Sequence, residues 1–190
     1  FAKGLRAILR QDPDVVMIGE MRDVETAQIG IQASLTGHLV LSTVHTNSAI
    51  AAITRLRDMG IESFLLASSL RTIISQRLVR RLCLNCCFEE DATNEIAKLF
   101  NLQAGKKIYN SKGCEDCSHT GYQGRIGLFE LIRMNNEIAD LVMEQRPGHV
   151  IREKAIESGM FSLLHDGLIK AQRGDTSLQE ILETLGTEKI

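Results

Sequence analysis

One short apolar run constrains the fold of this chain more than any other stretch. The run VVMI at residues 15–18 stands between Pro13 and Gly19. Such a run, bounded by turn-forming residues, is typical of a strand that is buried on both faces inside a parallel sheet. Glu20 follows, so its carboxylate is predicted at the carboxyl end of the strand, where open α/β sheets bind ligands. There it can polarise a water or help to hold a metal ion, although Glu20 could also simply begin the next loop.

The segments that follow alternate between helix and strand patterns. A helix is predicted from an N-cap at Asp23 to about Thr36, then a strand over residues 38–45, then a helix that begins at Asn47 or Ser48. With the helical pattern of the first ten residues, the order becomes helix–strand–helix–strand–helix. This order is typical of a parallel sheet covered by helices, and it predicts an α/β fold.

The remaining elements are predicted less regularly. They are a helix around residues 64–67, a strand or helix end over 75–82, a helix near 92–100, a strand over 124–132, and C-terminal helices whose last member begins with a capping box of Ser177 and Glu180. Composition changes at Cys83, so the chain is divided into a first segment (1–82), a cysteine-containing segment that resembles an insertion (83–124) and a strand with helices (125–190).

Composition excludes several classes of function. The chain is 44% apolar and 24% charged, which is ordinary for a soluble globular protein. Its net charge of -2, the absence of Trp and the 4% of aromatic residues give no case for a nucleic-acid partner. No apolar run approaches the roughly 20 residues of a membrane-spanning helix. The chain does not begin with Met, and its helical start predicts that it is a fragment of a longer protein.

The five cysteines carry the strongest chemical signal. Cys83 and Cys86 form one C-x2-C pair, and Cys114 and Cys117 form a second. Four thiolates suit a tetrahedral zinc ion, and a site with four protein ligands stabilises structure rather than performing catalysis. Redox chemistry is the main alternative. Two further residues complicate the ligand set, because Cys87 could replace Cys86 and His119 could enter the shell.

Two histidines bracket the second predicted strand. His38 and His45 are seven residues apart, so in an extended strand they point to opposite faces. His45 lies at the carboxyl end of the strand, beside the place predicted for Glu20. A purely structural role for either histidine stays open. The most basic stretch of the chain follows, with Arg71, Arg77 and neighbouring arginines, as a solvated face or as a site for an anion or an acidic partner.

Several of these motifs together resemble those of a known family. Residues 9–23 resemble the atypical Walker B segment of the type II secretion and type IV pilus assembly ATPases, in which a glycine replaces the usual aspartate and the next glutamate is catalytic. Residues 36–47 resemble the histidine box of that family. Residues 75–79 with the two cysteine pairs resemble the tetracysteine zinc motif of its assembly members, which the retraction members lack, and residues 121–130 resemble the strand that follows it.

The resemblance implies a RecA-like P-loop ATPase core. It further implies a homo-hexamer, peripheral at the cytoplasmic face of the inner membrane, that uses ATP and Mg²⁺ and carries structural Zn²⁺. ATP turnover would drive pseudopilus or pilus assembly through a membrane platform protein and other assembly proteins. Type II secretion is the preferred system, and type IV pilus assembly is the alternative. A zinc-containing interaction module without enzymatic activity is a third possibility.

The resemblance also implies roles for individual residues. Glu20 would activate the attacking water and position Mg²⁺, and His45 would approach the γ-phosphate. His38 and Arg77 would also contact the nucleotide, and residues 22 and 23 would lie near the active-site edge or a subunit interface. No G-x-x-x-x-G-K-[ST] loop occurs in the sequence. Since that loop cradles the phosphates, the 190-residue chain alone is predicted to be inactive as an ATPase.

Overall fold

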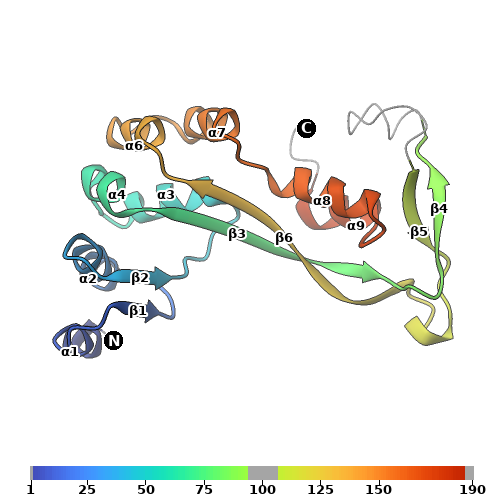
Figure 1. The fold of residues 1–190 in the computed structure, drawn as a ribbon, viewed down its shortest axis with the longest axis horizontal. Coiled ribbons are helices and arrows are strands. Elements are labelled where there is room, and N and C mark those ends of the chain that lie inside the picture. Colours follow the sequence, from blue (N-terminus) through green and yellow to red (C-terminus); the bar gives the residue numbers. More distant parts are fainter. Residues whose placement is uncertain (1, 94–106, 187–190) are drawn as a thin grey trace. The chain divides into compact units, whose positions relative to one another are not determined.

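The computed structural model describes residues 2–93 and 107–186, and Figure 1 shows their fold. The predicted helix near 92–100 lies almost entirely outside these residues. Packing divides the chain into two compact units, the first made of residues 1–75 and 131–160 and the second of 76–130 and 161–190. Each unit is built from two separate stretches of sequence. The division predicted at residues 82 and 124 separates segments of sequence by their motifs and does not describe these two packed units. It stays a prediction.

The first unit contains the predicted alternation of helices and strands. Its elements are α1 (Ala2–Leu9), β1 (Val15–Ile18), α2 (Val24–Leu35), β2 (Leu39–Ser42), α3 (Ala49–Asp58), α4 (Ser63–Ser69), α6 (Asn136–Met143) and α7 (Gly148–Glu157). β1 and β2 are parallel, with Val15 opposite Leu39 and Ile18 opposite Ser42. The α/β class and the parallel pairing predicted from the sequence are therefore confirmed for this part of the chain.

The burial predicted for the first strand is only half right. Val16 and Ile18 are buried against Ala2, Leu5 and Ile29, which belong to α1 and α2. On the opposite face of β1, Val15 is 54% exposed and Met17 is 75% exposed. Helices thus cover one face of the β1–β2 pair within the described residues. The prediction that both faces are buried is wrong for this chain.

Side-chain caps start two of the helices of this unit. The carboxylate of Asp23 accepts a hydrogen bond from the backbone N–H of Thr26 at 2.8 Å, and this bond lowers the pKa of the Asp23 carboxyl. The predicted cap of α2 is therefore confirmed. For α3 the cap is Ser48 rather than Asn47, since the Ser48 hydroxyl accepts from Ala51 N–H at 3.1 Å. These caps fix the residue at which each helix begins.

One apolar cluster holds five of the helices of the first unit together. It gathers buried residues of α2, α3, α4, α6 and α7 with the end of the last strand. Its largest fully buried side chains are Ile53, Leu66, Ile132 and Ile138.

No helix in the described part of the chain combines the length and apolar character that crossing a membrane requires.

Two long strands pair with each other, and both units contain part of this pair. They are β3 (Thr72–Leu82) and β6 (Tyr122–Arg133), which run side by side in Figure 1. Arg71 O accepts from Met134 N–H, and Gly121 O accepts from Cys83 N–H, so the strands run in opposite directions. The segment over 75–82, which the sequence left open between strand and helix end, is a strand.

The second unit adds a two-stranded sheet and two helices to this pair. Its further elements are β4 (Cys87–Asp91), β5 (Lys107–Ser111), the 3-10 turn η1 (Glu115–Cys117), α8 (Leu163–Gln172) and α9 (Leu178–Leu185). β4 and β5 are antiparallel, with Cys87 opposite Ser111. A small cluster of buried residues, including Ile108, Ala171 and Ile181, packs α8 and α9 with β5.

The predicted capping box of the last helix forms only in part. Ser177 is the N-cap of α9, and its hydroxyl accepts from Glu180 N–H at 3.1 Å. The Glu180 carboxylate, however, accepts from the backbone N–H of Arg80 at 2.8 Å and from Arg80 Nε at 2.6 Å. Glu180 is 5% exposed, and this carboxylate raises the pKa of the Arg80 guanidinium. Its partner lies 100 residues away in the sequence, which a local motif cannot reveal.

Glu180 should contribute far more to stability than its neighbour Glu183, which contacts the same arginine. We expect Glu180→Ala to lower the free energy of unfolding by about 1–3 kcal/mol, because it removes the acceptor of the part-buried Arg80 backbone N–H and of Arg80 Nε. Glu183→Ala removes only a half-exposed ion pair and should cost less than about 1 kcal/mol. Urea unfolding of both variants measures the difference, and equal losses would contradict this assignment.

Candidate functional site

The carboxyl ends of β1 and β2 form one edge of the first unit, and two predicted site residues meet there. Because Ile18 pairs with Ser42, the loops that follow the two strands leave side by side. Two hydrogen bonds tie these loops together: Thr43 Oγ1 donates to Gly19 O at 2.6 Å, and Met21 N–H donates to Thr43 O at 3.0 Å. These bonds take the chain out of the strand ladder, which is why β2 ends at Ser42 rather than at residue 45 as predicted.

Glu20 lies between two nitrogen-bearing side chains at this edge. Arg22 Nε is 2.6 Å from Glu20 Oε1, and His45 Nε2 is 3.1 Å from Glu20 Oε2. The hydrogen bond from Arg22 is the main cause of a lowered pKa of the Glu20 carboxyl, with a smaller contribution from His45. Glu20 is therefore ionised at neutral pH.

The two oxygens of the Glu20 carboxylate differ in their surroundings. Oε2 is shielded from solvent, and no described residue gives it a well-aligned hydrogen bond, since the approach of His45 Nε2 satisfies the distance but not the angle. A shielded carboxylate oxygen without a donor is uncommon, because leaving it unpaired costs free energy. This arrangement leaves one acceptor on Glu20 available to a further group.

A pocket opens beside this edge. It has a volume of about 260 Å³ and is lined by residues of the loop after β2, among them Thr43, Val44 and Thr46, with residues of α3 and of the start of β3. Hydroxyl groups and apolar side chains share its lining. The loop that carries His45 thus forms one wall of a cavity.

The other two residues predicted at the nucleotide are His38, in the first unit, and Arg77, in the second. His38 precedes β2 at its amino end, and its Nδ1 is 3.0 Å from the carbonyl oxygen of Ala33 near the end of α2. The structure therefore does not bring His38 together with Glu20 and His45. Arg77 is half-buried on β3 and belongs to the second unit. The proposal that either residue contacts a nucleotide stays a prediction.

The two cysteine pairs converge into one cluster in the second unit. The sulfur atoms of Cys83, Cys86, Cys114 and Cys117 all lie within 4.8 Å of one another. Sγ–Sγ distances are 3.8 Å between Cys83 and Cys114 and 3.9 Å between Cys86 and Cys117. Four thiolates around a tetrahedral zinc ion, each at roughly 2.3 Å, are about 3.8 Å apart. The cluster therefore fits such an ion.

Backbone groups prepare the cluster to bind a cation. The N–H groups of Cys114 and Gly121 both donate to Cys117 Sγ at 3.2 Å, and these bonds lower the pKa of the Cys117 thiol to about 6. Desolvation within the cluster raises the pKa of Cys86 to about 12 in the metal-free protein. A metal ion reverses that effect, because a coordinated thiol is deprotonated.

Cys87 and His119, which complicated the predicted ligand set, lie outside this cluster. Cys87 Sγ faces the carbonyl oxygen of Leu84 at 3.6 Å, and neither residue belongs to the described group of four sulfurs. Sequence reasoning missed the hydrogen bond between Asn85 Nδ2 and Asp116 Oδ2, at 2.8 Å, which links the two cysteine turns. The only indication of this bond in the sequence was that each C-x2-C pair encloses a polar residue, Asn85 in the first and Asp116 in the second.

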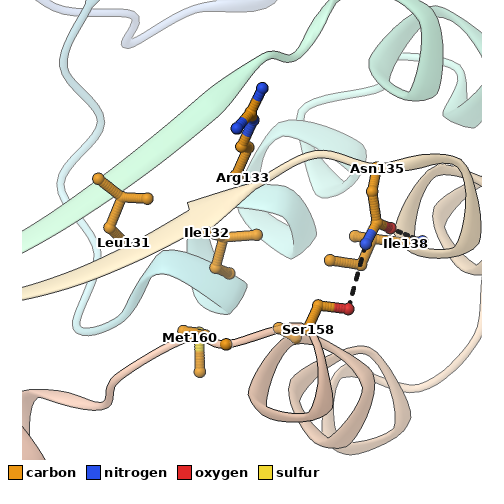
Figure 2. Close-up of a pocket in the computed structure, with 9 residues that line it drawn as sticks. Leu131, Ile132, Arg133, Asn135, Ile138, Ser158 and Met160 are labelled. Carbon is orange, nitrogen blue, oxygen red and sulfur yellow. Dashed lines mark hydrogen bonds between the residues drawn. The ribbon is translucent and has the colours of Figure 1, made fainter.

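A second pocket of the first unit contains none of the predicted site residues. Its volume is about 270 Å³. Figure 2 shows the residues that line it, from the end of β6 and from the helices α6 and α7. Asn135 Nδ2 donates to Ser158 Oγ at 3.1 Å across it, while Asn135 Oδ1 caps α6 by accepting from Ile138 N–H. Both polar atoms of the Asn135 side chain are therefore hydrogen-bonded within the protein. We interpret the pocket as a gap in the packing between helices.

Comparisons with known proteins agree with the motifs. Residues 1–183 match the family described as "Type II/IV secretion system protein". The chain is 52% identical over 184 residues to the "Type II secretion system ATPase E" of Vibrio cholerae, which is 96% of this chain and 36% of that protein. It is 46% identical over 186 residues to the "Type IV pilus assembly ATPase PilB" of Thermus thermophilus, covering 96% of this chain and 21% of that protein.

Solved structures give the same result for the fold. The pilus retraction motor PilT with bound ADP is similar with a TM-score of 0.69 and 27% identity, over 99% of this chain and 44% of that one. The Legionella pneumophila ATPase DotB is similar in fold, with a TM-score of 0.66 and 22% identity over 95% of this chain and 40% of that one. The chain thus spans about a third of the length of the curated secretion relatives it matches. A match over residues 1–183, together with a Glu20–His45 edge and a four-cysteine cluster at the expected places, assigns this chain to the type II/IV secretion system protein family.

Proposed function

We propose that this chain carries the hydrolytic edge of an ATPase that powers type II protein secretion. ATP hydrolysis in the complete protein would drive assembly of a pseudopilus, and the high identity to secretion ATPases of several bacteria favours this system over a type IV pilus. The family resemblance supports a RecA-like core for the first unit. It also supports a homo-hexamer at the cytoplasmic face of the inner membrane that works with a platform protein.

The convergence of Glu20 and His45 at one sheet edge is the observation on which this proposal rests. Phosphoryl transfer needs little covalent chemistry from a protein and depends on positioning and on electrostatic stabilisation. Glu20 is ionised, and its Oε2 atom has no aligned donor among the described residues, so it can accept a proton from an attacking water. His45, 3.1 Å from that oxygen and 84% exposed, can turn toward a phosphate group.

ATP, Mg²⁺ and Zn²⁺ have separate roles in this proposal. Mg²⁺ would neutralise charge on the phosphates, and Glu20 is the carboxylate at this edge that would help to orient its water ligands. The four thiols of Cys83, Cys86, Cys114 and Cys117 would hold Zn²⁺, which supplies folding free energy to the second unit. With four protein ligands the zinc site leaves no position for a substrate.

ATP hydrolysis by the complete gene product tests the proposal. We expect turnover that requires Mg²⁺ and that rises steeply with protein concentration, because the active form is a hexamer. The matched measurement uses the 190-residue chain, which lacks a phosphate-binding loop and should show no turnover. An oligomeric complete protein that binds zinc but hydrolyses no ATP would instead favour an interaction module.

A further inference from the structure

Asn85 and Asp116 occupy equivalent positions in the two cysteine turns, and a hydrogen bond joins their side chains. Asn85 stands immediately before Cys86, and Asp116 stands immediately before Cys117. Asn85 Nδ2 donates to Asp116 Oδ2 at 2.8 Å. Because the acceptor is a carboxylate, this bond is of the stronger, charge-assisted kind. It connects the two halves of the proposed zinc site from within the turns themselves.

Backbone bonds also connect the two halves, but they join the first turn to residues that flank the second. Cys83 N–H donates to Gly121 O at 2.9 Å, and Lys112 N–H donates to Cys86 O at 3.2 Å. These bonds continue from the ends of the β3–β6 and β4–β5 pairs. The strands therefore bring the two turns near each other, whereas the Asn85–Asp116 bond acts between the cysteines of each pair.

Zinc leaves a four-coordinate site by losing ligands, and here two ligands belong to each turn. Sulfur atoms that face each other across the two turns are 3.8 Å and 3.9 Å apart, in the pairs Cys83–Cys114 and Cys86–Cys117. When the turns move apart, both pairs separate and the ion loses half of its ligands. The Asn85–Asp116 bond spans the same gap, so it opposes this movement.

We infer that the Asn85–Asp116 bond slows the release of zinc by holding the two cysteine turns together. This inference rests on the proposed zinc site, and it concerns how long the ion stays bound. Groups outside the ligand shell of a metal commonly change its affinity about 10- to 100-fold. Because both side chains are exposed, we expect an effect at the lower end of that range.

The charge of Asp116 acts in the opposite direction, which separates the effect of the bond from simple electrostatics. Asp116 Oδ2 is 3.9 Å from Cys114 Sγ. Four thiolates outweigh the charge of one Zn²⁺ ion, so the loaded cluster is anionic and a neighbouring carboxylate destabilises it. Removal of this carboxylate should by itself slow zinc release. Loss of the Asn85–Asp116 bond should accelerate it.

The rate of zinc transfer to a chelator tests the inference in the complete gene product. Wild type, Asn85→Ala, Asp116→Ala and the double variant are loaded with zinc and mixed with a coloured chelator, at concentrations where the rate no longer depends on the chelator. We expect Asn85→Ala to release zinc about tenfold faster than the wild type. Asp116→Ala should also release it faster, in spite of the lost charge.

The double variant shows whether the two residues act through one bond. In a protein that already carries Asp116→Ala, the bond is absent, so Asn85→Ala should change the release rate less than about twofold. The matched control is Gln179→Ala. Gln179 Nε2 donates to Glu183 Oε1 at 2.9 Å, which is another exposed amide–carboxylate bond of the second unit, within α9. Its loss should leave the release rate within about twofold of the wild type.

Three results would overturn the inference while the proposed zinc site stands. They are a wild-type release rate in Asn85→Ala, slower release in Asp116→Ala, and an equal acceleration by Asn85→Ala in the presence and absence of Asp116. A different result would overturn the zinc site and this inference with it. That result is a wild type without bound zinc, or a zinc content that Cys114→Ser leaves unchanged.

Discussion

Replacing Cys114 by serine should remove bound zinc and unfold residues 83–93 and 107–117 around the cysteine cluster, while the first unit keeps its structure. A serine hydroxyl is a poor ligand for Zn²⁺ beside three thiolates, and structural zinc sites supply folding free energy directly. The substitution removes a sulfur atom that lies 3.8 Å from both Cys83 Sγ and Cys117 Sγ. We expect zinc content to fall from about one ion per chain to a small fraction, with new protease cleavage confined to this region.

Cys87→Ser is the matched control for this experiment. Cys87 is adjacent to Cys86 in the sequence, but its sulfur faces Leu84 O and stands outside the cluster of four. The control should therefore keep zinc and protease resistance. Metal analysis by mass spectrometry and limited trypsin digestion measure both properties. A Cys114→Ser protein that retains full zinc content and resists digestion would contradict the assignment of the site.

Replacing Glu20 by glutamine should abolish most ATP turnover without preventing nucleotide binding. Glutamine has nearly the same shape, but it cannot accept a proton at neutral pH, so only the proton-transfer contribution is lost. General-base catalysis is typically worth about 10²- to 10⁴-fold in rate. We expect kcat of the complete gene product to fall by about this factor, and the affinity for ATP to change only a few-fold.

Glu25→Gln is the control for charge removal near the same loop. Glu25 lies on the first turn of α2, 57% exposed, and pairs with Arg6 rather than with the sheet edge. Its replacement should leave kcat within about twofold of the wild type. If Glu25→Gln and Glu20→Gln lose turnover equally, the loss reflects general charge and not chemistry at Glu20.

Local patterns predicted those parts of the fold that neighbouring residues determine. The strand at Val15–Ile18 and the cap at Asp23 depend on a few adjacent residues, and the structure has them where the sequence indicates. The four-cysteine cluster was also predictable. A C-x2-C pair brings its own two sulfurs together, and two such pairs are typical of a shared zinc site. Parallel pairing of β1 and β2 followed from the helix between them.

Other features depend on packing between distant residues and could not be read from the sequence. The exposed face of β1, with Met17 at 75%, depends on what covers the sheet and not on the strand itself. The division into two discontinuous units arises because β3 and β6 both pass from one unit to the other. Glu180 fits a capping box by its spacing, yet its carboxylate binds Arg80, 100 residues away.

The candidate site was predictable in its main residues but not in its geometry. Glu20 and His45 both follow strands, which suffices to place them at one sheet edge. His38 has the same residue type and lies near the same strand, but its position at the amino end of β2 places its ring beside Ala33 O instead. The pairing of Arg22 with Glu20 depends on a loop conformation, which is fixed by hydrogen bonds to Thr43.

The chemical state of the nucleotide bound to the complete gene product tests the central claim most directly. Wild-type and Glu20→Gln proteins are each mixed with MgATP labelled in the base, separated from free nucleotide, and the bound nucleotide is identified by chromatography. If Glu20 activates the attacking water, the wild type should hold mainly ADP and the variant mainly ATP. Equal fractions of ADP in the two proteins, formed at equal rates, would place the hydrolytic chemistry elsewhere.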